Sequence, residues 1–585
     1  MSAVMKLREF TSYATNPTVD VPPSSSQGQM DAAIARLCEG AKSLAKLSLD
    51  QRIKLADSIQ QGFLRVGKGM VEAGCKAKGI TLGTTQEAEE WSTGLWGVVR
   101  QLRLIRESLT ALKRSGNTPI GPVARTIDGR LTVRLFPGNA IDRMLFKGIT
   151  AEVRMQASVT EESLERDRAR FYRQPDHDGR VLLVLGAGNI AAIAPMDVIT
   201  KMFNEGKAVL LKMNPVNAYL GPYIEEAFAE AIKQNFLAVV YGGADEGRYL
   251  VYHRDIDEVH ITGSDKTHDN IVWGPPGPQR EMRMQRQEPL LKKPITSELG
   301  NVSPVIVVPG PYSDRELRFQ AEDTATSFFM NASFMCCAAK MLVLPAGWAG
   351  SDAFVGGLRE TCLKVPPRRA YYPGAEDRWL KLTTGRKRIQ HLGNAMPGSL
   401  PWTFISGLDP NARDEPLYTQ EPFCSVISET RLGGTDPVEF LEQAVEFCNG
   451  TLWGTLNANL IVHPQSLRDP RINEAVERAI AKLRYGVVAV NAFIGMPFVL
   501  AAPPWGAYPG STPDDIQSGS GFVHNTSMLE GIEKTVFRAP LTSFPKPGYF
   551  ASHRTTHKMV PKIVAMEETA NWAKVPGIVL DAMRG

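Results

Sequence analysis

The chain has 585 residues, 43% of them hydrophobic and 22% charged, which leaves room for several domain-sized units with ample cores. Its 66 basic and 62 acidic residues nearly balance, which argues against a nucleic-acid or membrane partner. The seven cysteines form no CxxC or Cys–His cluster, and no apolar run is long enough for a membrane helix. We therefore expect a soluble, cytoplasmic protein with neither a bound metal nor a disulfide framework.

The first 180 residues contain four segments with different sequence patterns. Residues 1–29 end in a Pro/Ser/Gly-rich tract and are predicted to form a flexible arm. Over 31–113 apolar residues recur every three to four positions, which predicts helices. At 123–136 an Asp-Gly pair between two strand-like runs predicts a hairpin, and the charged run 161–178 is predicted to be a solvated helix.

From residue 180 onward, short Val/Leu/Ile-rich runs alternate with helical patterns, as in a parallel α/β sheet. Such strands with crossover helices are typical of a nucleotide-binding sheet. A Pro/Gly-rich, basic stretch at 274–294 is predicted to be an exposed loop. The predicted strands are 181–185, 208–211, 237–243 and 258–264, and the predicted helices about 196–205, 218–234 and 245–253.

Candidate binding residues follow three of these strands. GAGNIA at 186–191 satisfies G-x-G-x-x-A, whose glycines let the backbone approach a pyrophosphate, although the motif is common and no ribose-binding acid ends the next strand. Lys212 ends that strand where open α/β sheets bind ligands, or it is an ordinary solvated lysine. Gly263 and Ser264 close the fourth strand, and Ser264 can cap a helix whose N-terminus stabilises a phosphate.

The chemistry is predicted to lie between 292 and 345. Two buried strands, 305–308 and 341–344, are each preceded by a reactive side chain: Glu298 in a Ser-Glu-Leu-Gly turn, and the adjacent thiols Cys336 and Cys337. An acid and a thiol at the ends of neighbouring strands make a nucleophile with a base within reach. A cysteine beside a strand is, however, more often a packing residue than a catalytic one.

These motifs resemble those of the aldehyde dehydrogenase superfamily. ELGNVSP at 298–304 is similar to the segment that carries the family's general base, and CCA at 336–338 to the C-x-A segment that carries its nucleophile. This alignment implies Cys336 as the nucleophile, whereas an ungapped alignment would put Met335 in its place. Asn301, Ser333 and Phe334 depart from the family pattern.

The resemblance implies an aldehyde dehydrogenase-like α/β fold, with a Rossmann-type cofactor domain, an α/β catalytic domain and a β oligomerisation element. It implies NAD or NADP as the cofactor, and Pro215 in place of the family's 2′-hydroxyl-binding glutamate keeps NADP open. It also implies roles for single residues: Cys336 as nucleophile, Glu298 as base, Asn189 as oxyanion donor (or only a turn residue), and Lys212, Gly263, Ser264, Glu421 and Phe423 as cofactor contacts.

The function implied is oxidation of a small-molecule aldehyde to a carboxylic acid through a thioester on Cys336. A CoA-acylating dehydrogenase and a catalytically idle scaffold are the alternatives, and Glu298 favours hydrolysis because a coenzyme A thiol needs no activated water. Phe328, Phe334 and Met335 suggest an apolar tunnel for a medium, long-chain or aromatic aldehyde. HRTTH at 553–557 lacks the glutamate and third ligand of a zinc site.

The same reasoning divides the chain into units. A homodimer or homotetramer is expected, with the tail from about Phe537 packing on a neighbouring subunit, and the role of the 116–179 insert is left open. The units are a flexible arm (1–29), a dinucleotide-binding domain (30–115 and 180–297), a hairpin and oligomerisation insert (116–179), a catalytic domain (298–525) and a C-terminal oligomerisation tail (526–585).

Overall fold

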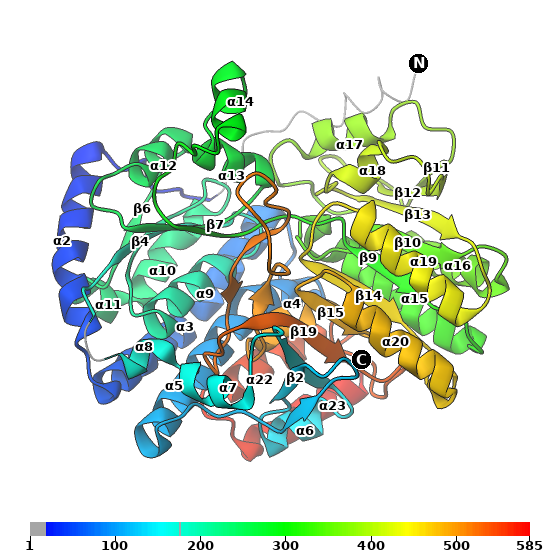
Figure 1. Cartoon of the computed structure of the whole chain (residues 1–585), viewed down its shortest axis with the longest axis horizontal. Coiled ribbons are helices and arrows are strands. Elements are labelled where there is room, and N and C mark those ends of the chain that lie inside the picture. Colours follow the sequence, from blue (N-terminus) through cyan, green and yellow to red (C-terminus); the bar gives the residue numbers. More distant parts are fainter. Residues whose placement is uncertain (1–18, 175–176) are drawn as a thin grey trace.

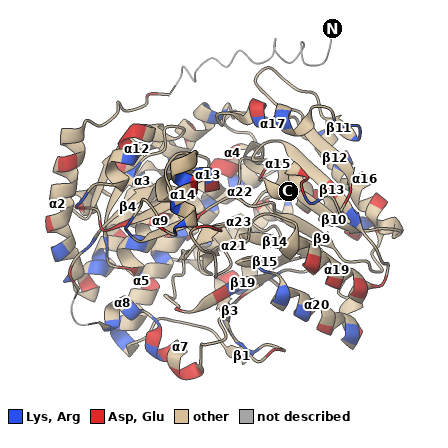
Figure 2. Cartoon of the chain, turned by 45° about the horizontal axis from the view of Figure 1, so that its top comes forward, with Lys and Arg blue, Asp and Glu red and all other residues tan. Residues whose placement is uncertain are grey.

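Two sheets stand side by side in the computed structural model, which describes residues 19–174 and 177–585 (Figure 1). Most strands of the smaller sheet come from residues 181–298 and one from 519–520, whereas the larger sheet combines three strands from 123–155 with eight from 304–538. Charged side chains gather on outer helices and are sparse on the strands (Figure 2). Most of the predicted arm, 1–29, lies outside the described residues, and its last three residues already belong to the first described helix.

The smaller sheet has six strands in the order β17-β8-β7-β4-β5-β6, and all neighbours except the β17–β8 pair are parallel. The four strands predicted after residue 180 are all present. Their continuous Val/Leu/Ile runs fit strands that are covered on both faces. The bounds are β4 (Val181–Leu185), β5 (Ala208–Lys212), β6 (Leu237–Val240), β7 (Glu258–Thr262), β8 (Ile295–Glu298) and β17 (Gly519–Ser520).

Helices cover this sheet as the periodicity predicts. Ser26 and Ser48 begin the first two with capping boxes, in which each serine and the glutamine three residues on satisfy each other's backbone N–H groups. The loop predicted at 274–294 is partly wrong, because it contains the exposed helix α14, begun by Pro278. The helices are α2 (Gln27–Ala45), α3 (Leu49–Lys78), α4 (Glu87–Glu90), η1 (Trp91–Trp96), α5 (Gly97–Ser115), α9 (Ile193–Ile199), η2 (Thr200–Asn204), η3 (Ala218–Leu220), α10 (Gly221–Ala227), α11 (Ala229–Lys233), α12 (Ala244–Val251), α13 (Asp265–Val272) and α14 (Pro278–Gln285).

The larger sheet has eleven strands in the order β1-β2-β3-β19-β15-β14-β9-β10-β13-β12-β11. Its centre, from β19 to β12, is parallel, and the predicted strands at 305–308 and 341–344 pair directly with each other as β9 and β10. The bounds are β1 (Val123–Arg125), β2 (Leu131–Phe136), β3 (Thr150–Met155), β9 (Pro304–Val307), β10 (Met341–Pro345), β11 (Ile389–Leu392), β12 (Trp402–Leu408), β13 (Val426–Leu432), β14 (Asn457–Ile461), β15 (Val487–Val490) and β19 (Ile532–Arg538). A separate pair joins β16 (Trp505–Gly506) to β18 (Phe522–Val523).

Helices also cover the larger sheet, and others lie in the insert (116–179) and in the C-terminal tail. The charged run 161–178 is not one helix, because Ala169, with φ of +54°, separates two short ones. The helices are α6 (Ala140–Leu145), α7 (Glu161–Asp167), α8 (Arg170–Arg173), α15 (Asp314–Phe329), η4 (Met330–Ser333), α16 (Ala349–Lys364), α17 (Ala375–Thr383), α18 (Pro416–Thr419), α19 (Pro437–Gly450), η5 (Ser466–Arg468), α20 (Pro470–Lys482), α21 (Met496–Leu500), α22 (Thr556–Met566), η6 (Trp572–Lys574) and α23 (Val575–Met583).

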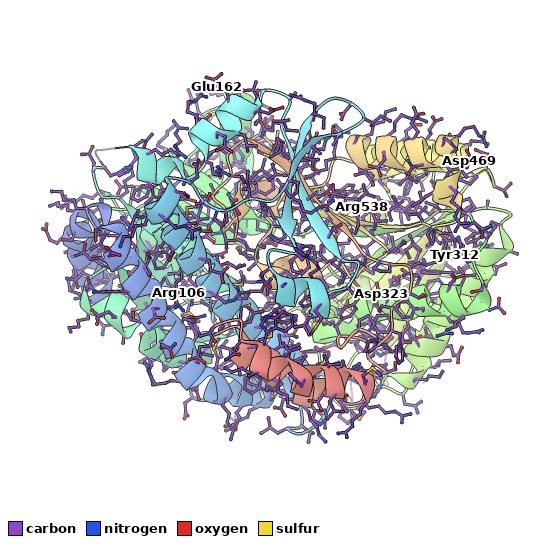
Figure 3. All side chains as sticks on the ribbon, turned by 90° about the horizontal axis from the view of Figure 1, so that it is seen from below. Arg106, Glu162, Tyr312, Asp323, Asp469 and Arg538 are labelled. Carbon is purple, nitrogen blue, oxygen red and sulfur yellow. The ribbon has the colours of Figure 1, made fainter. Side chains whose placement is uncertain are left out.

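The insert and the tail both join the larger sheet. The predicted hairpin is present as β1 and β2, with Gly129 at φ +80° in its turn, and β19 of the tail runs between β3 and β15. Beyond β19 the tail crosses the bottom of the molecule (Figure 3), where α22 packs on α4 and η1 of its own chain. Packing of the tail on a neighbouring subunit, like the boundaries of the predicted units, stays a prediction.

One buried ionic cluster fixes the tail to the N-terminal half. The carboxylate of Glu567, just after α22, accepts hydrogen bonds from Arg100 at 2.7 Å and from Arg103 at 2.7 Å, and Arg100 also binds Asp142. Burial alone would raise the pKa of Glu567, but the two guanidinium groups lower it to about 2. The carboxylate therefore stays ionised at neutral pH, and the cluster joins α5, the insert and the tail.

Replacing Glu567 by alanine is expected to lower the free energy of unfolding by about 3–5 kcal/mol, because it leaves buried arginine charge without its partner. Glu568→Ala is the matched control, since Glu568 is 38% exposed and pairs only with Lys574 on the surface. It should cost less than about 1 kcal/mol. Urea unfolding followed by circular dichroism measures the free energy of unfolding of both variants. Equal losses of stability would contradict the role of Glu567 in fixing the tail to the N-terminal half.

Candidate functional site

The acid and the thiol meet where the two sheets face each other. Glu298 is the last residue of β8, and its backbone carbonyl accepts a hydrogen bond from Gly263 N–H at 3.0 Å. On the other side β8 pairs with β17. The Cys336 thiol, which precedes β10 of the larger sheet, donates to Glu298 Oε1 at 3.1 Å. Residues 38 positions apart are thus brought into hydrogen-bond contact.

A strained loop presents this thiol. Asn331, Ala332 and Ser333 have φ of +51°, +53° and +69°, a left-handed run that few non-glycine residues adopt and that costs stability. Lys340 holds the loop from below, since its buried Nζ donates to the Ser333 carbonyl at 2.9 Å and hydroxyl at 2.8 Å. Burial lowers the pKa of Lys340 to about 8. The backbone carbonyl of Cys336 accepts a hydrogen bond from the Ser303 hydroxyl at 3.2 Å.

Two cavities meet at Cys336. The first, which we call the sheet-edge cavity, has a volume of about 890 Å³ and lies at the carboxyl ends of the smaller sheet's strands. The second, which we call the tail cavity, has a volume of about 630 Å³ and is walled partly by residues 539–582. Both are lined by Asn189, Ile193 and Cys336. Cys337 is 3% exposed and borders the tail cavity but not the sheet-edge cavity, so Cys336 is the thiol at the junction.

All eight site residues predicted from the sequence line the sheet-edge cavity. They come from segments more than 200 residues apart: five lie at the carboxyl ends of strands of the smaller sheet, and Cys336, Glu421 and Phe423 precede strands β10 and β13 of the larger sheet. Their proximity is therefore established, while the role of each stays a prediction. They are Asn189, Lys212, Gly263, Ser264, Glu298, Cys336, Glu421 and Phe423.

Burial raises the pKa of both reacting groups. It raises the pKa of Glu298 to about 7, although the contact with Cys336 opposes this, and Oε2 of Glu298 has no protein partner. The pKa of Cys336 lies well above that of an ordinary thiol because of its contact with Cys337, its burial and the Glu298 charge. At neutral pH the thiol is therefore protonated, and Glu298 is half ionised and in position to accept its proton.

Asn189 lies in the predicted turn after β4 and is 7% exposed. Its side-chain N–H donates to the Phe334 carbonyl at 2.9 Å, which joins the turn to the cysteine loop. Its own backbone carbonyl accepts hydrogen bonds from Tyr371 at 2.9 Å and from the Asn331 side chain at 3.1 Å. The amide is thus firmly oriented beside Cys336, and since it has two N–H donors, one remains for a ligand.

The network behind Asn189 was missed from the sequence. Buried Lys78 donates to Glu90 at 2.7 Å, to the Asn331 side chain at 3.1 Å and to the Asn189 carbonyl at 3.3 Å. Lys78 ends a long amphipathic helix, where a lysine usually reaches solvent, so its sequence position gave no signal. Asn331 lies in the segment FFMNASFMCC, where an asparagine five residues before the thiol was the one available cue.

The sheet-edge cavity fits a dinucleotide. Ser264 caps α13 by accepting a hydrogen bond from Thr267 N–H, so the helix N-terminus opens into the cavity. Burial lowers the pKa of Lys212 to about 8, and burial raises that of Glu421 to about 8. Glu421 Oε1 is buried without a partner, and a Cβ at Gly300 would lie 2.1 Å from Glu421 Oε2. These polar groups are held ready for a ligand that offers hydroxyls and phosphates.

Two of the three side chains expected to form an apolar tunnel lie elsewhere. Phe328 is fully buried and packs on Trp402, and Phe334 packs between Tyr371 and Tyr372. Met335 does line the tail cavity. The sequence could not separate the cases, because the left-handed run before Phe334 turns the chain in a way that no periodicity predicts.

Residues 145–369 match the model of the aldehyde dehydrogenase family. Among curated proteins the chain is 29% identical over 133 residues to 4-trimethylaminobutyraldehyde dehydrogenase of Bos taurus, covering 23% of this chain and 24% of that protein. It is 31% identical over 171 residues to N-succinylglutamate 5-semialdehyde dehydrogenase of Novosphingobium aromaticivorans, covering 28% and 32%. These matches therefore span a quarter to a third of the relatives' length.

The likeness of the fold extends over nearly the whole chain. Succinic semialdehyde dehydrogenase from Streptococcus pyogenes, solved in complex with NADP+, superposes with a TM-score of 0.58 at 16% identity, covering 88% of this chain and 96% of that one. NADP-dependent glyceraldehyde-3-phosphate dehydrogenase from Bacillus halodurans, complexed with NADP, superposes with a TM-score of 0.57 at 17% identity, covering 88% of this chain and 92% of that one.

In the described part of the chain, no cluster of three metal-ligating side chains and no membrane-spanning helix is present.

Iodoacetamide should alkylate Cys336 before Cys337, because only Cys336 opens into both cavities. The rate should rise with pH, since the thiolate is the reactive form and the pKa of Cys336 is raised. In Glu298→Gln the midpoint of this rise should move to lower pH, because the carboxylate charge that opposes ionisation is gone. Peptide mass spectrometry measures both thiols; earlier labelling of Cys337, or a midpoint that moves upward, would contradict this geometry.

Proposed function

We propose that the chain is a member of the aldehyde dehydrogenase superfamily and an enzyme that oxidises an aldehyde to a carboxylic acid with NAD or NADP, which the match of residues 145–369 to the family model and the likeness of the fold support. One observation carries the proposal: the Cys336 thiol lies 3.1 Å from Glu298 Oε1 at the junction of two cavities. One cavity fits a dinucleotide, and the other is free for the substrate. A nucleophile has to lie between the two to serve both.

The reaction begins with the proton of the thiol. Glu298 accepts this proton, and the Cys336 sulfur attacks the aldehyde carbon, so that a carbon–sulfur bond forms and the carbonyl oxygen becomes an oxyanion. The side-chain N–H of Asn189 and the backbone N–H of Cys336 stabilise this oxyanion. A typical donor of this kind contributes about 3–4 kcal/mol to the transition state.

Lys212, Ser264, Glu421 and Phe423 would hold a dinucleotide, which when bound would supply the acceptor for the hydride that leaves the former aldehyde carbon. Cys336 is then left with a thioester. Once Glu298 has released the thiol proton to solvent, it takes a proton from water, and the resulting hydroxide replaces the sulfur and releases the carboxylic acid. Glu298 then returns its proton to the thiolate, which restores the thiol. A pKa of about 7 suits Glu298 to both tasks, because it can accept and return a proton near neutral pH.

Two further properties belong to the proposal. A cytoplasmic location is supported by free cysteines at all seven positions, as in a reducing compartment. A homodimer or homotetramer is supported by β1, whose three residues are all exposed at the edge of the larger sheet and leave backbone groups available for pairing.

The choice between NAD and NADP depends on the residue after β5. With Pro215 there, where the family carries a glutamate, the 2′-phosphate of NADP meets no carboxylate at that position.

Cys336→Ala is expected to abolish aldehyde-dependent production of NADH or NADPH while leaving dinucleotide binding unchanged. Cys337→Ala, the matched control one residue away, should retain activity. The assay is the absorbance of the reduced cofactor with a panel of aldehydes, with NAD and NADP in turn and with and without coenzyme A.

Each arm of this assay decides between alternatives. Loss of activity in Cys337→Ala alone would move the nucleophile by one residue. Activity that requires coenzyme A would make the enzyme an acylating dehydrogenase. Tight dinucleotide binding without reduction by any aldehyde in the wild type would favour a catalytically idle scaffold.

A further inference from the structure

The tail cavity is lined mainly by apolar side chains, with polar and charged ones among them. From Cys336 it is lined by side chains of η1, the segment 490–505 and the tail. At about 630 Å³ it has the size of a small-molecule site. The apolar lining residues include Trp96, Phe329, Met335, Phe493, Met496, Phe498, Val499, Trp505, Phe550, Met559, Val560, Ile563 and Ile578.

Each charged group on this lining is paired or exposed. Glu89 and Arg368 form an ion pair, Lys546 pairs with Glu322 outside the lining, and Lys147 and Lys364 lie at the surface. No charged side chain of the described lining is fully buried. A charged aldehyde would therefore find no unpaired counter-ion inside, whereas an uncharged hydrocarbon would lose only its contact with water.

Large apolar side chains are also exposed on the lining of the cavity, beside the surface lysines Lys147 and Lys364. Three lining residues are large, hydrophobic and exposed: Met144 by 43%, Phe544 by 80% and Val579 by 38%. They come from α6, from the loop after β19 and from α23, three segments far apart in the sequence. Exposed apolar side chains gathered at the opening of an apolar cavity are typical of a ligand entrance.

The wall that the tail contributes is held rigidly. Tyr549, which lines the cavity, donates its hydroxyl to buried Asp323 of α15 at 2.8 Å, and Lys546 pairs with Glu322 at 3.1 Å. In Figure 3, Asp323 lies beside the tail. Together with the Glu567 cluster these contacts fix both ends of the segment 546–567. The cavity is thus a built feature of the fold and does not depend on a loose segment.

We propose that the tail cavity binds the hydrocarbon chain of a long-chain aliphatic aldehyde, with the aldehyde group at Cys336 and the chain directed towards Met144, Phe544 and Val579. This inference rests on the proposed function, because the cavity leads to Cys336. It makes the C-terminal tail the part of the chain that selects the substrate.

A homologous series of straight-chain aldehydes from propanal to hexadecanal tests this. For the wild type, kcat/KM should rise about fourfold for each added methylene that enters the cavity and then level off. Succinic semialdehyde, with a carboxylate at the far end of a short chain, should be a poor substrate. If kcat/KM is flat or falls with chain length, the inference is overturned.

Variants in the tail locate the effect. Ile563→Trp fills the cavity from α22, and Ala582→Phe narrows it from α23 at a less buried position, where folding is less at risk. Both should lower the ratio of kcat/KM for hexadecanal to that for propanal by at least about tenfold. Leu580→Phe is the control, because Leu580 is exposed on the same helix and does not line the cavity. An unchanged ratio in both cavity variants would contradict the assignment.

A binding measurement separates this inference from the proposed function. Hexadecanoic acid, which carries the chain of the expected product, should bind to the wild type in calorimetry, and more weakly to Ile563→Trp and Ala582→Phe. Oxidation of propanal without binding of the acid would leave the proposed function standing and overturn the chain site. Binding of the acid without oxidation of any aldehyde would support the chain site and overturn the proposed function.

Discussion

The hydrogen bond between the Cys336 thiol and Glu298 Oε1 is the contact on which the rest of this site depends. The acid ends a strand of one sheet, and the thiol precedes a strand of the other, so the contact exists only if both sheets form and face each other correctly. At the edge of the smaller sheet, Gly263 N–H holds the Glu298 carbonyl, and beneath the larger sheet Lys340 holds the cysteine loop. Chemistry and fold are therefore coupled at a single pair of atoms.

Keeping this pair in position costs stability, and the surrounding structure offsets that cost. A carboxyl group buried at Glu298, an ammonium group buried at Lys340 and three consecutive left-handed residues are each unfavourable alone. Shared hydrogen bonds compensate for them, since Lys340 binds the strained Ser333. The buried Glu567 cluster adds stability far from the reacting atoms and fixes the tail that walls one of the two cavities. The free energy cost of the strained site is therefore offset by favourable contacts elsewhere in the fold.

Local patterns predicted the sheets well and the site in part. Strands β4 to β7 could be predicted because each is a short, largely buried run of apolar residues. Lys212, Gly263 and Ser264 could be predicted because they lie at the carboxyl ends of these parallel strands. Cys336, Glu421 and Phe423 precede strands of the larger sheet and were identified through the resemblance to family motifs. Phe334 was misplaced because the left-handed run at 331–333 has no signature in ordinary residues, and Phe328 because sequence alone does not separate a core position of helix α15 from a cavity wall. The contacts of Lys78 with Asn331 and of Arg100 with Glu567 join residues 253 and 467 positions apart, and no local sequence pattern predicts such pairs.

Cys336 is expected to form the covalent bond to the substrate, and Glu298 to activate the water that releases it. Quenching the enzyme with acid during turnover of an aldehyde and a dinucleotide, followed by peptide mass spectrometry, would locate the acyl group. An acyl thioester should be found on Cys336, and it should accumulate further in Glu298→Gln. An acyl group on Cys337, or none in either protein while the dinucleotide is being reduced, would contradict this role of Cys336.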